Sequence, residues 1–600
     1  MIRRRKVGRA AGPAWASTCA IAAGVVLLAP GLRAAEAQPT ELVSRAGDDT
    51  LGNNTSDSPA VSADGRFVVF LSKSNDLVPG DTNGRVDVFV RDRANQSTVR
   101  VSVSSAGVEA DKDSANPAIS ADGRFVAFGS VAMNLVVADT NGQKDVFLHD
   151  RDPDVDGIFD EPGAISTVRA SVDDVGAERT RAASQPAVSG DGRWVAFEAA
   201  EGSGKQDVRV FDRLSGTSVV LSVDSNGVLG NGKSENPQLS TSGRFLVFES
   251  NANNLVVDDD NRTVDIFWVD RDADVDGAFD EPLETITLRA SLDSNGEEGD
   301  DASRYPDVSD DGTQVVFAST AANLDVGITN NKRDVFVRDM TAGATFRISL
   351  GPGGVEGSAE STLPWISGDG RCVLFQSAAS NLVPNDANTD RDVFLYDRDS
   401  DLDGVLDDPA GTRLERVSVD SSGAESNGHS GDIVRPMLST DGLYAVFNSA
   451  ASNLVADDDN GKRDVFLHRT RCSDQGFTFK SIAPCRMLDT RDPDGAVGGP
   501  ALPARGARTF SAADICGVPA NAKAVAALIA VVDPAAGGYL TLYPSGVSRP
   551  VASSVNFVPG EVTNNSQFVT LSDDGTAAFR AYNGASGETD IIVDVTGYFN

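Results

Sequence analysis

Three acidic loops of nearly identical sequence carry the clearest chemistry in the chain. Each reads Asp-x-Asp-x-Asp-Gly and closes on an Asp three residues after the glycine. Calcium takes about six to eight oxygen ligands, and carboxylates at positions 1, 3 and 5 of a tight loop converge on one point. The glycine permits the sharp turn, position 7 offers a carbonyl oxygen, and position 9 offers a closing carboxylate. The predicted Ca²⁺ ligand sets are Asp152, Asp154, Asp156, Ile158 and Asp160; Asp272, Asp274, Asp276, Ala278 and Asp280; and Asp399, Asp401, Asp403, Val405 and Asp407.

The setting of these loops distinguishes them from EF-hands. An EF-hand carries Glu at position 12 and lies between two helices. Here position 12 is Gly163, Leu283 or Ala410, and both flanks predict strands. The loops resemble the Asp-x-Asp-x-Asp-Gly-x-x-Asp calcium hairpins of integrin-type propellers. The alternative is an acidic, solvated hairpin tip. We favour calcium, because charge alone requires neither the alternate spacing nor the glycine.

A second, weaker acidic pattern consists of Asp-x-Asn phrases with a further Asp four residues after the Asn. Asn and Asp side chains cap turns without any metal, so we favour capped turns over metal sites here. The phrases are Asp81/Asn83/Asp87, Asp139/Asn141/Asp145, Asp259/Asn261/Asp265, Asp386/Asn388/Asp392 and Asp458/Asn460/Asp464.

A sevenfold repeat positions both kinds of loop. The phrase Ser-x-Asp-Gly-Arg-Phe, or a close variant, recurs with its glycine at Gly65, Gly123, Gly192, Gly243, Gly312, Gly370 and Gly442. Within the second copy we predict short strands over 117–120, 125–128, 145–148 and 167–172, with a tight Asp-Gly turn between the first two. Short, regularly spaced strands with aromatics in register predict the blades of an all-β propeller. The calcium loops follow copies two, four and six.

The ring of blades closes through the N-terminus. The seventh copy has no fourth strand, but residues 41–46 resemble the other fourth strands and precede the first copy. We therefore predict seven blades, with the N-terminal strand completing the last one. Strand alternation places the Asp-x-Asn loops on one face of the disc and the calcium hairpins, with the Asp-Gly turns, on the other.

The repeat resembles that of TolB-like β-propellers. Pro-x-x-Ser-x-Asp-Gly-Arg-Phe-Val-x-Phe, followed by Asp-Val-Phe-Val-x-Asp, carries this resemblance over roughly residues 41–470. It implies the fold and leaves the function open, because one fold hosts many activities.

The N-terminus predicts export. A basic start at residues 3–6, an apolar segment and the small-x-small phrase at 35–37 indicate a bacterial signal peptide over 1–37. Secretory and twin-arginine export both stay open. We expect a monomer that is secreted or exposed on the cell envelope, with the periplasm as an alternative. No stretch is long enough to span a membrane. The net charge of −36 opposes nucleic acid as a partner.

After the propeller, assigned to 38–471, a different module occupies 472–600. Alternating strands near 539–543 and 591–595 predict a β-sandwich-like domain, and its motifs resemble a terminal module of exported bacterial proteins. Cys485 and Cys516 are a candidate disulfide. Cys472 has no assigned partner but could compete for one of them. Arg486, Asp489 and Arg491 could bind a ligand; we favour a structural ion-pair network.

No catalytic constellation stands out. His149 and His468 occupy equivalent repeat positions and predict a tolerant surface site, and His429 lies in a linker turn. Cys372 takes a core-facing strand position, which predicts a small buried hydrophobe. We therefore expect a calcium-binding scaffold for a protein or glycan ligand rather than an enzyme. The alternative is an extracellular glycosidase or lyase that uses propeller carboxylates.

Overall fold

The computed structural model describes residues 40–281, 283–408, 411–431, 434–472, 479–493, 495, 497–513, 515–519, 522–545, 549, 553–572 and 577–599. The predicted signal peptide lies outside these residues. The described chain is all-β apart from one turn of 3-10 helix at Gly202–Gly204. It contains no helix with the length and hydropathy that crossing a membrane requires.

Seven four-stranded antiparallel sheets follow one another between Thr40 and Arg469, and we number them in chain order. Sheets one to four comprise β2 (Ser56–Val61), β3 (Phe67–Ser72), β4 (Asp87–Asp92) and β5 (Ser97–Arg100); β6 (Ser114–Ile119), β7 (Phe125–Ser130), β8 (Asp145–Asp150) and β9 (Ser166–Arg169); β10 (Ala183–Val188), β11 (Trp194–Ala200), β12 (Gln206–Asp212) and β13 (Thr217–Val220); and β14 (Ser234–Leu239), β15 (Phe245–Ser250), β16 (Asp265–Asp270) and β17 (Ile286–Arg289). Sheets five to seven comprise β18 (Ser303–Val308), β19 (Gln314–Ser319), β20 (Asp334–Asp339) and β21 (Ala344–Arg347); β24 (Ser361–Ile366), β25 (Cys372–Ser377), β26 (Asp392–Asp397) and β27 (Arg413–Arg416); and β28 (Met437–Leu438), β29 (Tyr444–Ser449), β30 (Asp464–Arg469) and β1 (Thr40–Leu42). A small hairpin, β22 (Leu350–Gly351) with β23 (Val355–Glu356), follows sheet five.

The N-terminal strand fills the fourth-strand position of sheet seven, as predicted. β1 pairs antiparallel with β30, and Thr40 lies opposite His468. Ser44 Oγ donates to Asp464 Oδ1 at 2.6 Å. Ser102 makes the same bond to Asp87 in sheet one, at 2.5 Å. The N-terminal segment therefore reproduces the bonding of the other fourth strands.

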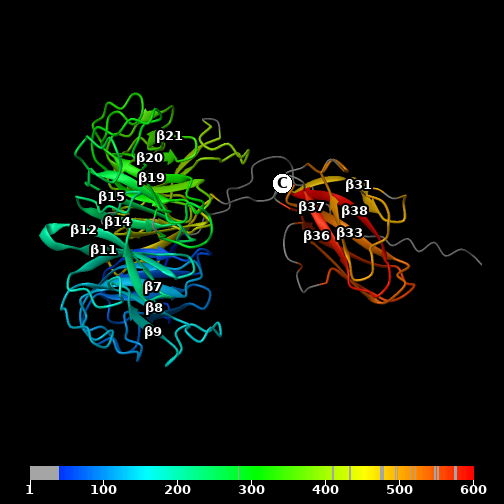
Figure 1. The fold of residues 1–600 in the computed structure, drawn as a ribbon, viewed down its shortest axis with the longest axis horizontal. Helices are drawn as coiled ribbons and strands as arrows, with labels where there is room; N and C mark the ends of the chain where they lie inside the picture. The colour runs from blue at the N-terminus through cyan, green and yellow to red at the C-terminus, as the bar shows by residue number, and fades with distance from the viewer. Residues whose placement is uncertain are drawn as a thin grey trace, which may run out of the picture.

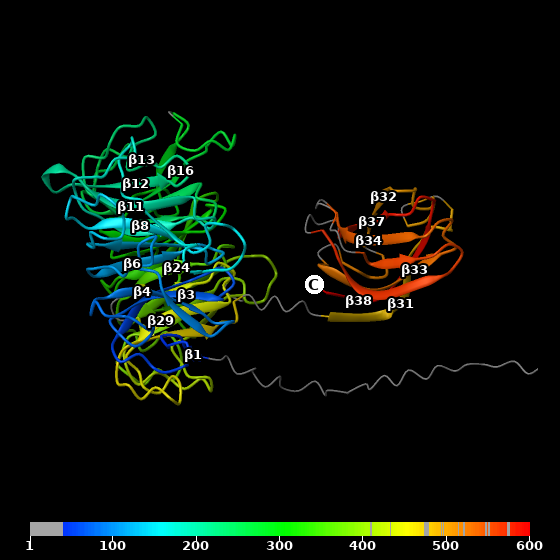
Figure 2. The same cartoon turned by 90° about the horizontal axis from the view of Figure 1, so that it is seen from below.

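Neighbouring sheets pack face to face, so their second strands are buried on both sides. The buried cluster beside sheet one joins Val69 and Val90 to Phe128 and Phe147 of sheet two. Each first strand contacts the sheet before it, and β2 of sheet one contacts β29 of sheet seven. This succession of sheets is the β-propeller architecture, and consecutive sheets lie side by side in Figures 1 and 2.

Aromatic side chains fill the seams between sheets. Phe67, at the start of β3, packs against Gly123 in the Asp-Gly turn of sheet two, where a Cβ would lie 2.2 Å from the ring. Gly123 also has φ +75°, so both space and conformation require glycine. Tyr444 of sheet seven packs in the same way against Gly65 of sheet one. That contact links the last sheet to the first.

A disulfide replaces this aromatic between sheets six and seven, so the prediction of a lone Cys372 was wrong. Cys372, at the start of β25, bonds to Cys472, with the Cα atoms 6.1 Å apart. Cys472 Sγ is the nearest atom to a Cβ built on Gly442, at 3.2 Å. The bond joins the end of the propeller chain to sheet six. Its partners are 100 residues apart, so sequence alone could not pair them.

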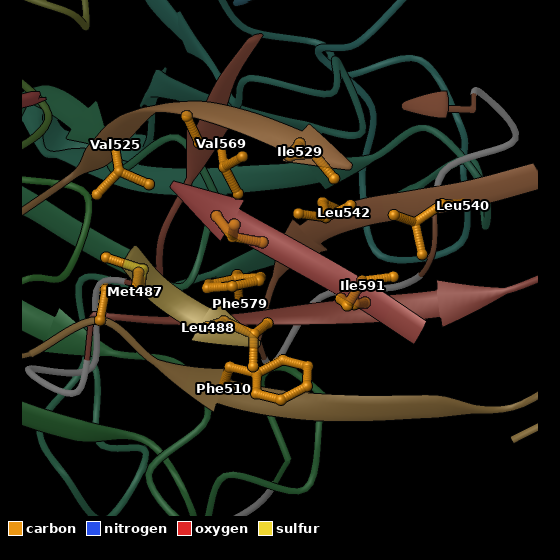
Figure 3. Packing of buried hydrophobic residues seen from close by; sticks show 14 of the residues in the cluster. Met487, Leu488, Phe510, Val525, Ile529, Leu540, Leu542, Val569, Phe579 and Ile591 are labelled. Atoms are coloured by element: carbon orange, nitrogen blue, oxygen red, sulfur yellow. The ribbon is translucent and has the colours of Figure 1, made fainter. Parts of the chain in front are cut away.

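The C-terminal part contains two four-stranded antiparallel sheets. Their orders are β31 (Phe479–Asp489), β38 (Asp590–Phe599), β33 (Ala524–Val532), β36 (Thr563–Thr570), and β32 (Ala507–Ser511), β37 (Ala578–Asn583), β34 (Gly538–Pro544), β35 (Val555–Phe557). Both sheets contribute to one buried cluster, with Phe510 and Phe579 from one and Ile529 and Ile591 from the other (Figure 3). The predicted disulfide between Cys485 and Cys516 is present, with an S–S distance of 2.01 Å.

Candidate metal centres and central channel

The three predicted calcium loops connect the third and fourth strands of sheets two, four and six. In the first, carboxylate oxygens of Asp152, Asp154 and Asp156 all lie within 4.8 Å of one another. The same holds for Asp272, Asp274 and Asp276 in sheet four. Positions 1, 3 and 5 therefore converge, as the spacing predicted.

Hydrogen bonds to the backbone organise each loop. The Asp152 carboxylate accepts the N–H groups of Asp156 and Gly157, both at 3.1 Å, and Asp156 Oδ1 accepts that of Ile158 at 2.9 Å. Gly157 has φ +85°. The same bonds recur in the other two loops. The residue pattern thus specifies one local structure three times.

The converging carboxylates carry negative charge that the protein does not neutralise. None of the carboxylates at positions 1, 3 and 5 forms an ion pair within the described chain. Partial desolvation, followed by repulsion from Asp156 and Asp152, raises the pKa of Asp154. The pKa of Asp401 in the third loop is raised for the same reasons. Hard oxygen donors with excess negative charge fit a calcium ion.

The predicted closing carboxylate, position 9, is engaged elsewhere. Asp160 accepts hydrogen bonds from Arg151 Nε at 3.0 Å and from Nη2 at 2.5 Å. Arg151 is 2% exposed and lies between the rings of Phe67 and Phe159, at 4.7 and 4.9 Å. Its Nη1 donates to the carbonyl of Gly123 at 2.6 Å. The hairpin is therefore fastened to the seam between sheets one and two.

The same buried arginine recurs in the other two hairpins. Arg271 pairs with Asp280 and Arg398 with Asp407, each at 2.6 Å. These arginines were not among the predicted site residues, although each directly precedes position 1 of its loop. In this structure the donors left for a metal are the carboxylates of positions 1, 3 and 5 and the carbonyl of position 7.

The Asp-x-Asn loops are capped turns, as predicted, and an arginine occupies the centre of each of them except that of sheet seven. Asn83 Oδ1 accepts the N–H of Arg85 at 2.7 Å, and Asn83 Nδ2 donates to Asp87 at 2.8 Å. Arg100 Nη1 lies 3.1 Å from Asp81. Equivalent arginines lie among carboxylates in sheets two, four, five and six: Arg169, Arg289, Arg347 and Arg416. Here the protein supplies its own cation.

The two repeat histidines are buried, so the prediction of a surface site was wrong. His149 is 1% and His468 4% exposed. Thr167 Oγ1 donates to the carbonyl of Val103 at 2.6 Å and therefore accepts from His149 Nδ1 at 2.9 Å. Thr40 and His468 make the equivalent contact at 2.9 Å. Burial lowers the pKa of both histidines to about 4. Each histidine thus bonds to a threonine of its own sheet, and the threonine bonds to the link after the preceding sheet.

A cavity of about 440 Å³ lies where the first strands of all seven sheets meet. Six residues that precede a proline on these strands have φ between 50° and 58°: Ser58, Asn116, Gln185, Asn236, Tyr305 and Leu363. Arg435 stacks on Trp365 at 4.8 Å and donates to the carbonyl of Pro364 at 2.7 Å. Asp307 lines the same wall, and burial raises its pKa to about 6.

An adjoining acidic pocket contains Glu198, Glu235 and Glu249. Glu198 accepts the N–H of Asn236 at 2.9 Å, and Glu249 accepts that of Tyr305 at 2.9 Å. Burial raises the pKa of both glutamates. Each carboxylate thus satisfies a backbone group of the following sheet.

In the C-terminal part, the Arg486 cluster is the ion-pair network that we favoured. Arg486 lies 2.9 Å from Asp594 and 3.1 Å from Asp489. Arg491 pairs with Asp489 at 2.7 Å. These pairs connect β31 with β38 and the turn that follows β31, a structural arrangement.

No family model and no curated protein matches the chain. Among solved structures, it is similar to a TolB protein from Agrobacterium tumefaciens, with 17% identity over 49% of this chain and 80% of that chain and a TM-score of 0.29. It is also similar to an oligogalacturonate lyase in complex with manganese, with 12% identity, 73% and 94% coverage and a TM-score of 0.40. The β-propeller domain of the trilobed protease from Pyrococcus furiosus matches with 10% identity, 69% and 95% coverage and a TM-score of 0.39. Likeness at this level transfers no functional residue.

Proposed function

We propose that this chain is an exported, calcium-binding protein, built as a seven-bladed propeller with a C-terminal β-sandwich-like domain. It acts as a monomeric binding or scaffold protein for a protein or glycan ligand. One observation carries the metal part: the hairpins of sheets two and four each bring three carboxylates, at positions 1, 3 and 5, within 4.8 Å of one another, and none of these has a cation partner in the described chain. Two disulfides support an oxidising location outside the cytoplasm.

Calcium in these hairpins would stiffen long connections at the seams between blades. Each hairpin is fastened by its buried arginine to the carbonyl of the turn glycine of its own sheet, Gly123, Gly243 or Gly370, so order in the loop reaches the packed core. Ligand binding to the native state raises stability by mass action. The role of the metal is thus structural.

The central cavity is the proposed ligand site. Its wall combines Trp365, Tyr305, Arg435 and Asp307, which suits a ligand with both polar and apolar surfaces. Binding is favoured over glycan cleavage, because the buried Glu198 and Glu249 are committed to backbone N–H groups. A glycosidase or lyase needs carboxylates that are free to act on substrate.

Calcium titration of the mature chain by calorimetry tests the metal sites. The triple variant D154N/D274N/D401N replaces one charged ligand of each hairpin by a neutral amide and should weaken calcium binding at all three. If the triple variant binds calcium with the same affinity as the wild type, the hairpins are not the sites. A glycan and envelope-protein binding screen, repeated with Trp365→Ala, tests the cavity; sustained glycan turnover would favour the enzyme.

A further inference from the structure

One Asp-x-Asn cluster of the repeat, in sheet seven, lacks the arginine that lies at the centre of the others. In sheet one, Arg100 lies opposite Phe89 and reaches Asp81 at 3.1 Å and Glu109 at 2.9 Å. In sheet seven, the residue opposite Phe466, the equivalent of Phe89, is Leu42. The arginine position is therefore apolar in this sheet alone among the sheets that carry a complete Asp-x-Asn phrase.

The glutamate that pairs with this arginine in other sheets is also absent from sheet seven. Glu109 forms a β-bridge with Val103, and the equivalent bridge beside sheet seven joins Arg45 to Leu51. Leucine thus replaces both the arginine and the glutamate of the other clusters. The two aspartates of the cluster, Asp458 and Asp464, are retained.

Asp458 is left without a partner. It is 7% exposed, and both of its carboxylate oxygens are buried without a hydrogen bond. No Lys or Arg nitrogen of the described chain lies within 4.0 Å of it. Arg45, the nearest candidate, instead pairs with Asp457 at 2.7 Å and donates to the carbonyl of Asp49 at 3.1 Å.

Asp464 is the second carboxylate of this cluster. It is fully buried; its Oδ1 accepts from Ser44 at 2.6 Å and its Oδ2 accepts from Asn460 at 2.8 Å. Burial and the neighbouring charge of Asp464, partly offset by the more distant Arg45, raise the pKa of Asp458 to about 6. A buried, unpaired carboxylate beside a second one is costly unless a cation or a proton neutralises it.

We propose that a divalent cation binds between Asp458 and Asp464, in the position that an arginine guanidinium occupies in the other sheets. The donors are carboxylate oxygens only, which selects a hard ion of the calcium or magnesium class. The site belongs to the Asp-x-Asn face of the propeller and is independent of the hairpins. It would fasten the N-terminal strand, through Ser44 and Asp464, to the last sheet.

Counting bound calcium per mature chain by equilibrium dialysis tests this site. Asp458→Asn should lose one ion relative to the wild type, while the hairpin variant D154N/D274N/D401N should keep that ion. The double variant L42R/L51E, which restores the charged pair of the other sheets, should also lose it without loss of thermal stability in chelator. This variant keeps the test valid if Asp458→Asn fails to fold.

Equal calcium content in the wild type, Asp458→Asn and L42R/L51E would overturn the proposal. In that case Asp458 is neutralised by a proton instead, and the unfolding temperature should depend on pH but not on calcium at this site. Failure of the hairpin sites would look different, because the wild type would then bind one ion and Asp458→Asn none.

Discussion

The two kinds of acidic loop in this propeller have similar sequences and opposite electrostatics. The Asp-x-Asn clusters on one face surround a buried guanidinium, as Arg100 does between Asp81 and Glu109. The hairpins on the other face hold Asp152, Asp154 and Asp156 together with no internal cation. Acidic residues at regular spacing therefore do not specify a metal site by themselves. What matters is whether the fold delivers an arginine to the same point.

Removal of the internal cation should have the largest effect. Arg100→Met removes the cation beside the buried carboxylates of Asp81 and Asp87, and such a change costs about 3–5 kcal/mol in the free energy of unfolding. Urea unfolding of the mature chain measures it. Leu42→Met is the matched control in sheet seven and should cost less than about 1.5 kcal/mol. Equal losses in the two variants would mean that the guanidinium neutralises nothing.

Calcium should stabilise each single hairpin by a somewhat smaller amount. At a free concentration of about 100 times Kd, an ion stabilises the native state by about 2.7 kcal/mol per site. The single variant Asp154→Asn should lose part of this increment, while its stability in chelator should match or exceed that of the wild type because carboxylate repulsion is relieved. Thermal unfolding with and without calcium checks both parts. A variant whose unfolding temperature falls as much in chelator as in calcium would contradict the view that the hairpin carboxylates are stabilised by a metal.

The arginine that fastens each hairpin should rank third. Arg151→Lys keeps the charge but loses the two-pronged bond to Asp160 and the stacking on Phe67 and Phe159, at a cost of about 1–2 kcal/mol. Arg93→Lys in sheet one is the control. Arg93 pairs with the more exposed Glu41, so the loss should be smaller. Chemical denaturation compares the two variants.

A pH effect should be the smallest and should separate the two faces. Burial and the neighbouring Asp265 raise the pKa of Asp259 to about 6 from 3.8. Because the folded-state pKa is raised, its stabilising contribution is complete below pH 3.8 and is lost as pH rises through 6. Asp259→Asn should therefore flatten the stability profile between pH 3.8 and 6 by about 1 kcal/mol or less, after allowance for solvent screening.

Asp154→Asn is the matched variant for that profile. The pKa of Asp154 is also raised, but its side chain is exposed, so we expect Asp154→Asn to flatten the slope between pH 3.8 and 6 by less than Asp259→Asn does. Unfolding free energies of Asp259→Asn and Asp154→Asn, measured in chelator at intervals across this pH range, show which residue contributes more to the slope. A slope that responds only to Asp154→Asn would reverse the assignment of the buried cluster.

Much of the fold could be predicted, because its signals are local and repeated. The Asp-Gly turns, the paired strands and the closing strand near Thr40 all follow from short phrases with fixed spacing. The convergence of Asp152, Asp154 and Asp156 could be predicted for the same reason. The engagement of Asp160 by Arg151 could not, because the arginine is fixed by rings from two different sheets.

Two of the misplaced residues have partners far away in the chain. Cys372 bonds to Cys472, and His468 contacts Thr40 from the other end of the propeller. A buried histidine at a repeat position looks like a surface residue when the equivalent residues of other copies, Arg91 and Tyr396, are polar. Only the packing of adjacent sheets revealed that this position is a seam.

The sequence by itself determined the repeat, the turns, the closing strand and the three hairpins, because each depends on residues within a few positions of one another. The tertiary structure decided which acidic groups are neutralised. Arg100, Asp81 and Glu109 come from a strand, a loop and a link that meet only when the sheet is folded. The charge balance of a buried carboxylate depends on what surrounds it in space, and beside Asp458 the position that an arginine fills in the other sheets is taken by Leu42.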